Sequence, residues 1–276
     1  MVAKKVKVNV ENYYFSSRSK LKDFSTSDTQ GLEETKDVRK KIKENMREVA
    51  ELQEKLFAES QQSLLVVLQA MDAAGKDSSI RKLTSKLNSA SCVVHSFKKP
   101  TKKELSHDFL WRVHQRAPAK GYINFFNRSH YEEVLVVKVH KLIGPAEVKR
   151  RYKQINDFES LLAANGTRVV KVMLNVSKRY QLGRFKKRLE NPGKWWKFNP
   201  GDLDERKLWT SYMGAFEKAM QNCSSKKAPW YVLPAENRWF RDLVLSELML
   251  KNLKAMKPKY PEASFNVKDY PPEDLV

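Results

Sequence analysis

The chain has 276 residues, a length that suits one large α/β domain or two smaller ones with a sizeable buried core. Lysine and arginine number 53 against 32 aspartate and glutamate, which gives a formal net charge of +21. This excess favours a polyanionic partner such as nucleic acid, an anionic membrane or a phosphate-rich substrate, and disfavours a cationic or purely apolar ligand. Hydrophobic residues make up 41% of the chain, too many for a disordered protein, so the chain should fold.

Two cysteines, Cys92 and Cys223, stand far apart and in no metal-binding spacing. We therefore expect neither a disulfide framework nor a structural zinc site. This cysteine usage favours a reducing compartment. No window approaches the roughly 18 consecutive apolar residues of a membrane helix. Residues 1–10 alternate lysine with valine and lack the apolar run of a signal peptide. These features predict a cytoplasmic protein with no membrane partner.

The chain begins with a polar segment and continues as an amphipathic helix. Residues 1–34 are rich in serine and threonine and have no sustained period, which predicts an irregular N-terminal arm. From residue 35 to 60, apolar residues recur every three or four positions, as in a helix with one buried face. Short apolar runs follow, each typical of a strand buried on both faces of a parallel sheet. They cover residues 63–71, 92–97, 122–126, 168–176 and 230–233.

The stretches between these runs are long enough for crossover helices. The clearest helix covers 145–164, with Pro145 in its first turn and Asn165-Gly166 as its stop. Strands that alternate with helices predict a three-layer α/β/α domain over residues 35–255, built on a five-stranded parallel sheet. Residues 256–276 contain four prolines and predict an irregular tail. Ligands of such sheets bind beyond the carboxyl ends of the strands, so the chemistry should lie there.

The first run leads into a small-residue turn and a helix-like stretch, the arrangement of a phosphate-binding loop. Lys76 would supply a mobile cation, although Ala70 and Asp77 depart from the general GxxxxGK[ST] pattern. An ordinary strand-to-helix turn is therefore the alternative. Asp72 favours the phosphate site, because a carboxylate among phosphate-facing amides is costly unless it holds a cation such as Mg²⁺. The candidate phosphate-binding residues here are Ala73, Ala74, Gly75, Lys76, Asp77 and Ser78.

The third run ends in Asn127 and Arg128. In phosphate-transfer proteins of this topology an aspartate here helps to bind the metal, whereas Asn127 offers only a neutral oxygen. Arg128 can clamp phosphate oxygens with two parallel hydrogen bonds. His130 is more typical of a packed or solvent-facing histidine than of a general base.

Residues 168–197 hold ten basic side chains and one acidic side chain, the most lopsided charge in the sequence. A helical stretch begins at Ser177, and Arg184 and Arg188 share one face because they are four residues apart. With Lys178, they predict a lid over about 177–200 that closes on phosphates and neutralises transition-state charge. A solvated basic face is the alternative.

Several stretches in one order, from about residue 35 to 255, together resemble the polyphosphate kinase 2 family. They are MDAAGKDSSI (71–80), SFKKPTKKELSHDFLWRVHQRAPAKG (96–121), FNRSHYEEVLVVKVH (126–140), LNVSKRYQLGRFKKRLENPGKWWKF (174–198) and APWYVLPAENRWFR (228–241). The asparagine in FNRS and the glutamate pair after Tyr131 are most similar to the subgroup called class III, whose members phosphorylate nucleoside monophosphates and diphosphates.

The resemblance implies a P-loop kinase fold, dependence on Mg²⁺ or Mn²⁺, and reversible transfer of the terminal phosphoryl group of inorganic polyphosphate to AMP or ADP. Asp72 corresponds to the carboxylate that holds Mg²⁺ or orients the acceptor phosphate, and Arg184 and Arg188 correspond to lid arginines. The implied catalytic residues are Asp72, Lys76, Asn127 and Arg128, and the implied nucleotide-binding residues are Lys98, Arg128 and Glu132. Guanine nucleotides as further acceptors and a homodimer or homotetramer are also expected.

Two other functions fit parts of the sequence. An ATP-dependent nucleoside monophosphate kinase would share the fold but would need no long cationic surface. A basic nucleic-acid-binding module could stack bases on Phe185, Trp195 and Trp196. No recognition helix or RNA-binding signature supports that module, so nucleic acid is not the expected partner.

Overall fold

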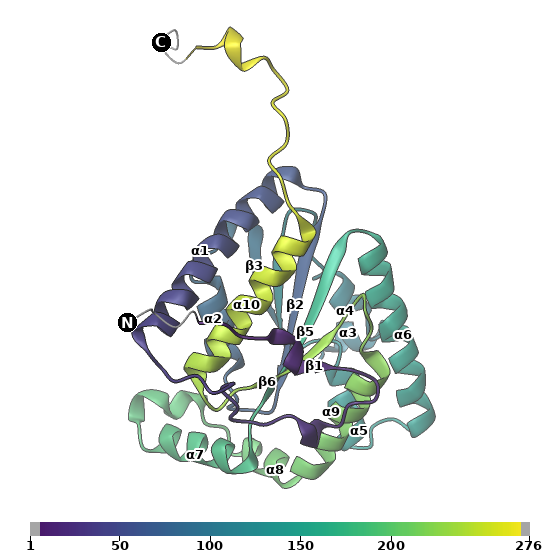
Figure 1. Ribbon diagram of the computed structural model, residues 1–276. Helices are drawn as coiled ribbons and strands as arrows, with labels where there is room; N and C mark the ends of the chain where they lie inside the picture. Colours follow the sequence, from purple (N-terminus) through teal and green to yellow (C-terminus); the bar gives the residue numbers. More distant parts are fainter. Residues whose placement is uncertain (1–5, 272–276) are drawn as a thin grey trace.

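The computed structural model describes residues 6–271 and has a six-stranded sheet between two layers of helices (Figure 1). The strand order is β1-β6-β5-β2-β4-β3. The strands are β1 (Tyr14–Phe15), β2 (Ser63–Ala70), β3 (Cys92–Ser96), β4 (Ile123–Asn127), β5 (Thr167–Asn175) and β6 (Trp230–Pro234). The predicted three-layer α/β/α fold is confirmed.

The five apolar runs all form parallel strands, but the sheet has one strand more than predicted. β1 comes from the N-terminal arm and pairs antiparallel with β6, with Tyr14 opposite Tyr231. The prediction of a five-stranded, purely parallel sheet was wrong in this detail. A two-residue strand has no period that a sequence pattern can show, and it forms here because it covers the open edge of β6.

Each face of the sheet packs against its own set of helices. α1 (Lys36–Glu59), α2 (Lys76–Thr84) and α10 (Arg238–Met256) lie on one face, and α5 (Glu132–Val139), α6 (Pro145–Ala164) and α9 (Trp209–Cys223) lie on the other. In β2, Leu64 and Val66 face the first set while Leu65 and Val67 face the second. This double burial is the reason for the continuous apolar run in the sequence.

The remaining helices belong to two of the connections between strands. α3 (Lys102–Leu105) and α4 (Trp111–His114) connect β3 to β4. α7 (Lys178–Leu189), a 3₁₀ turn over Pro192–Lys197 and α8 (Gly201–Lys207) follow β5 and lie across the bottom of the molecule in Figure 1. Ser177 caps α7 by accepting a hydrogen bond from Tyr180 N at 3.1 Å. The segment expected to form a lid therefore sits over the edge of the sheet where ligands bind.

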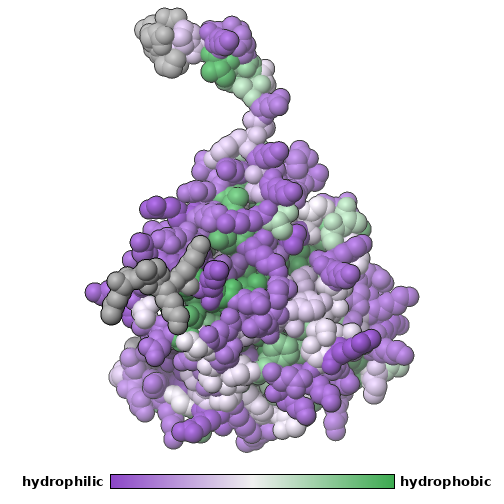
Figure 2. Space-filling view, in the orientation of Figure 1, coloured by the Kyte–Doolittle hydropathy of each residue, from purple (hydrophilic) through white to green (hydrophobic). Residues whose placement is uncertain are grey.

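The N-terminal arm and the C-terminal tail differ in their contacts. The arm crosses the loops after β5 and β6, where Phe24 O accepts from Asn175 Nδ2 at 2.9 Å and Thr26 O accepts from Glu236 N at 3.2 Å. The tail beyond α10 projects away from the body (Figure 1). Figure 2 shows hydrophilic residues over most of this face of the molecule. None of the helices within residues 6–271 has the length and apolar character needed to cross a membrane.

Candidate active site

The loop between β2 and α2 has the backbone shape of a phosphate-binding loop. Ala73 and Gly75 both have left-handed backbone, with φ of +63° and +110°. The positive φ favours glycine at position 75, and a side chain there would also force the Arg241 guanidinium to shift. α2 starts directly after this bend, and Ser79 N donates to Gly75 O at 3.0 Å. The loop thus places the amino end of α2 beside a buried arginine.

The side chains of this loop have other partners. Ala74 is packed in the core, and Ser78 Oγ donates to Gly75 O at 2.8 Å. Asp77 is exposed and accepts from Asn127 Nδ2 at 2.7 Å. That contact turns the Asn127 amide toward α2, and Asn127 does not line the central cavity described below. The backbone N–H groups are therefore the part of this loop best suited to a phosphate.

Lys76 is folded back over the start of the loop. Its Nζ donates to Ala70 O at 2.9 Å and to Met71 O at 3.4 Å. Burial lowers the pKa of Lys76, although the negative charge of Asp72 opposes this effect. The ammonium group is thus buried close to the Asp72 carboxylate and held by the loop backbone, whereas the sequence analysis expected a mobile cation.

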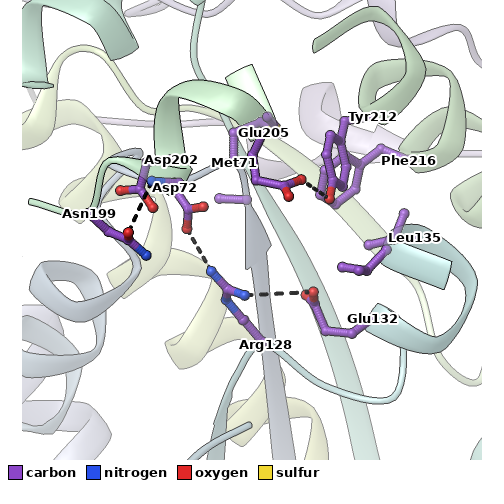
Figure 3. A pocket seen from close by; sticks show the side chains of 13 residues that line it. Met71, Asp72, Arg128, Glu132, Leu135, Asn199, Asp202, Glu205, Tyr212 and Phe216 are labelled. Atoms are coloured by element: carbon purple, nitrogen blue, oxygen red, sulfur yellow. Dashed lines mark hydrogen bonds and ion pairs between the residues drawn. The ribbon is translucent and has the colours of Figure 1, made fainter. Parts of the chain in front are cut away.

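Asp72, Arg128 and Glu132 form a chain of alternating charges at the ends of β2 and β4 (Figure 3). Arg128 Nη2 donates to Asp72 Oδ1 at 2.7 Å, and Arg128 Nη1 lies 3.9 Å from Glu132 Oε2. Burial alone would raise the pKa of Asp72, but the charges of Lys76 and Arg128 outweigh it and hold this pKa below its ordinary value. Burial raises the pKa of Glu132 despite the positive charge of Arg128.

A cavity of about 300 Å³ lies beside this chain of charges. Its lining includes two carboxylates of α8, Asp202 and Glu205, which the sequence analysis missed. Burial, and next the charge of Asp72, raise the pKa of Asp202. Glu205 accepts a hydrogen bond from Tyr212 Oη at 2.6 Å. The only available signal was the appearance of acidic residues directly after a strongly basic segment.

Arginines from two helices lie near the loop between β2 and α2, residues 71–75, which we call the phosphate-type loop. Arg184 and Arg188 extend from α7, whereas Arg238 and Arg241 belong to the first turn of α10. Burial, followed by the charge of Arg238, lowers the pKa of Arg184, so these two guanidinium groups face one region. Arg188 pairs with Asp202 at 3.4 Å, but Arg184 and Arg238 make no ion pair within residues 6–271. Unpaired guanidinium groups beside the amino end of a helix suit a bound polyanion.

Arg238 and Arg241 were not predicted. They follow β6, the last of the strands whose carboxyl ends define the binding edge. Applying the strand-end rule to that strand would have selected the same stretch.

One member of the basic segment has a different place. Lys171 is fully buried in the centre of β5, where its ammonium group pairs with Glu159. The pleat of β5 turns its side chain into the core between the sheet and α6, so this member of the basic segment does not contribute to a charged surface. His130 is likewise buried, as the packed interpretation expected. Phe185 is buried too and is not available for stacking on a base.

Lys98 and Lys178 lie apart from the central cavity. Lys98 lines a second cavity, of about 390 Å³, together with Arg112 and Arg116. This cavity also contains Ser96, which is opposite Asn127 in the β3–β4 register, so it opens at the same end of the sheet. Lys178 is exposed, and its carbonyl accepts from Arg206 Nη1 at 2.6 Å.

The central cavity fits a divalent cation that is shared with phosphate. The part of the chain that the structure describes has no group of three or more His, Cys, Asp or Glu side chains arranged to hold a metal. Mg²⁺ at phosphate sites commonly uses one or two carboxylates, with phosphate and water oxygens as its other ligands. Asp72 and Asp202 match that donor set, because both line the cavity and the charge of one raises the pKa of the other.

A phosphate-type loop, unpaired arginines and a carboxylate-lined cavity at one edge of a parallel sheet are the features of a P-loop phosphotransferase. The family model of polyphosphate kinase 2 matches residues 32–261, and the chain belongs to this family. The predicted family is thus confirmed.

Individual relatives agree with this membership. The chain is 44% identical to the AMP/ADP-polyphosphate phosphotransferase of Meiothermus ruber over 246 residues, which cover 89% of this chain and 92% of the relative. It is 41% identical to the ADP-polyphosphate phosphotransferase of Rhodopseudomonas palustris, with 81% of each chain covered. The crystal structure of polyphosphate kinase 2 from Arthrobacter aurescens TC1 superposes with a TM-score of 0.91 at 40% identity, covering 94% of this chain and 93% of that one.

Proposed function

We propose that this protein transfers the terminal phosphoryl group of inorganic polyphosphate to AMP or ADP in a Mg²⁺-dependent reaction, with Mn²⁺ as a substitute ion. The observation that carries the proposal is the pairing of an arginine cluster with a carboxylate-lined cavity across one phosphate-type loop. The arginines suit a chain of phosphates, and the cavity suits a single acceptor phosphate with its cation. The names of the relatives that this chain matches point to the same substrates.

The donor would lie along the arginine side of the loop. Backbone N–H groups of residues 73–78 and the Lys76 ammonium would hold its terminal phosphoryl group. Arg184, Arg188 and Arg238 would hold the phosphates behind it. Because the terminal phosphoryl group gathers charge on its outer oxygens as it transfers, these fixed cations stabilise the transition state.

The acceptor would enter from the cavity side. Arg128 would clamp its phosphate, and Glu132 would orient Arg128 and influence which nucleotide is accepted. Lys98, in the neighbouring cavity, would contact the rest of the nucleotide. An acceptor phosphate oxygen attacks the terminal phosphorus of the donor, the P–O bond to the next phosphate breaks, and polyphosphate leaves one unit shorter.

Asp72 and Asp202 would hold the cation between donor and acceptor. When bound, Mg²⁺ neutralises phosphate charge that would otherwise repel the attacking oxygen. Asp72 has the lowered pKa that this role requires, since it stays ionised at neutral pH. Class III character, guanine nucleotides as further acceptors, a dimeric or tetrameric assembly and a cytoplasmic location complete the proposal.

The test is direct transfer with purified protein. Incubation with Mg²⁺, long-chain polyphosphate and AMP or ADP should yield ADP and ATP, measured by separating the nucleotides, and chelation of Mg²⁺ should stop it. Lys76→Ala should abolish transfer while leaving the protein folded. Lys82→Ala, an exposed change on the same helix, should keep it. Phosphorylation that occurs only with a nucleoside triphosphate as donor would refute the proposal.

A further inference from the structure

A charged network lies buried beneath the loop that carries Arg128 and Glu132. Lys171 on β5 and Glu159 on α6 are 0% and 2% exposed and form an ion pair in the core. Lys171 Nζ also donates to Tyr131 Oη at 2.9 Å and to Cys223 O at 2.6 Å. All three hydrogens of the ammonium group therefore have an acceptor.

The network ends on the residues between Arg128 and Glu132. Tyr131 Oη donates to Glu159 Oε1 at 2.9 Å, and His130 Nε2 lies 3.2 Å from the same oxygen. Tyr131 is completely buried and immediately precedes the first residue of α5. A shift of its hydroxyl would therefore move the start of α5 and, with it, Glu132.

The backbone of Arg128 needs such support. Its φ of +62° is left-handed, a conformation that a residue other than glycine keeps only when its surroundings enforce it. On one side, Arg128 N donates to Leu68 O at 3.1 Å. On the other side, Ser129 Oγ accepts from Gln69 Nε2 at 3.1 Å, and the Glu159 contacts follow. The residues after Arg128 are thus fixed to the sheet and to α6.

Stability alone is a poor explanation for this ion pair. A buried pair in an apolar core can often be replaced by well-packed apolar residues without loss of stability, because desolvation of both charges offsets their attraction. A fully bonded pair does, however, fix directions that apolar contacts leave free. Here the fixed group is the Tyr131 hydroxyl.

We propose that Lys171 and Glu159, through Tyr131, are positioning residues that hold Arg128 and Glu132 in the geometry needed for phosphoryl transfer. This inference rests on the proposed function, because it gives Arg128 a role in the reaction. None of the three residues touches the central cavity.

The test compares two tyrosines of the same core. Tyr131→Phe removes the hydroxyl that joins the pair to the loop. Tyr152→Phe is the matched control, since the Tyr152 hydroxyl is buried and has no hydrogen-bond partner among residues 6–271. Tyr131→Phe should lower kcat for polyphosphate-driven ADP formation about tenfold, with the KM for polyphosphate changed less than twofold. Tyr152→Phe should leave kcat within about twofold.

A double-variant cycle separates positioning from a general loss of stability. Arg128→Lys keeps the positive charge but loses the paired hydrogen bonds, so it should lower kcat by itself. In that background, Tyr131→Phe should change kcat less than twofold, because the geometry that it supports is already lost. Melting temperatures of all variants are measured in parallel.

The outcomes distinguish the two proposals. Full activity of Arg128→Lys and Arg128→Ala would overturn the role of Arg128 in the proposed function. Impaired Arg128 variants combined with a normal Tyr131→Phe would overturn the positioning role alone, as would an equal effect of Tyr131→Phe in both backgrounds. If Tyr131→Phe does not fold, the double change Glu159→Gln with Lys171→Met, which removes both buried charges together, is measured in the same cycle.

Discussion

At the scale of single residues, the candidate site contains carboxyl groups whose pKa values are shifted in opposite directions. The cations around Asp72 keep its pKa low, whereas burial raises the pKa of Asp202 and Glu132. As the pH falls, Asp202 and Glu132 therefore take up protons before Asp72 does. A cation shared by Asp72 and Asp202 would offset the repulsion between the two carboxylates, so both can line the same cavity in ionised form.

Replacement of either carboxylate by its amide should impair transfer. We expect Asp72→Asn and Asp202→Asn each to lower kcat roughly 100- to 1000-fold, the usual loss when one group that stabilises transition-state charge is removed. Asp202→Asn should also raise the Mg²⁺ concentration needed for half-maximal rate. The measurement is initial rate against Mg²⁺ at saturating polyphosphate and AMP.

Asp204→Asn provides the control for this pair. Asp204 is two residues from Asp202 on α8, but its side chain is 74% exposed and, among residues 6–271, pairs only with Lys207. The variant Asp204→Asn removes one negative charge from the same helix and changes no residue that lines the cavity. Near-normal rates and an unchanged Mg²⁺ requirement in Asp202→Asn would contradict the role given to Asp202.

At the scale of elements, α7, α8 and the start of α10 close the binding edge of the sheet. α7 is tied to the loop after β2, since Gln181 Nε2 donates to Asp72 O at 3.0 Å. It is tied to α8 through Arg206, which reaches Lys178 O and Gln181 Oε1. Only Gln181 and Phe185 of α7 are buried, so this helix can move more easily than the core helices, which bury a whole face. That property suits a lid over about residues 177–200.

The two faces of α7 should respond differently to loss of charge. Arg184→Ala and Arg188→Ala should each lower kcat/KM for polyphosphate about 100-fold, because Arg188 pairs with Asp202 at the cavity and Arg184 faces the arginines at the start of α10. Lys186→Ala and Lys187→Ala remove exposed cations from the same helix and should stay within about twofold. Steady-state kinetics with varied polyphosphate compares them. Equal losses for all four variants would mean that α7 acts only as a diffuse basic surface.

At the scale of the whole molecule, the basic side chains behind the net charge of +21 lie in different environments. Part of it is in the core, as with Lys171, and part is neutralised by surface ion pairs of the kind that α1 and α10 make through Lys41–Glu247 and Lys254–Glu48. The arginines over the phosphate-type loop remain without full compensation. A long polyanion would cover many of these charges at once, whereas a nucleotide would cover few.

Salt should therefore affect the two substrates unequally. Each phosphate that binds to a basic side chain releases counterions, so the KM for long-chain polyphosphate should rise more steeply with salt than the KM for AMP. In a plot of log KM against log salt concentration, we expect a steeper slope for long-chain polyphosphate than for AMP. Inorganic triphosphate as donor is the control, because a chain of three phosphates displaces fewer counterions and should give a slope near that of AMP. Equal slopes for all substrates would return the excess charge to a general surface property.

Local patterns in the sequence determined most of the fold and the main part of the candidate site. The apolar runs of β2 and β5, and the period of α1, arise from burial that repeats with the local geometry, so they can be read without knowing the partners. The loop from Asp72 to Ser78 and the spacing of Arg184 and Arg188 are local in the same sense. They predicted a phosphate site at a strand end and a basic helix over it.

Only the tertiary structure decided which residues meet there. Asp202 and Arg238 lie more than a hundred residues from Asp72 along the chain and reach the site because α8 and α10 start at the same edge of the sheet. Lys171 stands within the basic segment, yet the pleat of β5 and the position of Glu159 on α6 place it in the core. Contacts between distant segments depend on packing directions that no local period encodes, and for that reason they had to be seen in three dimensions.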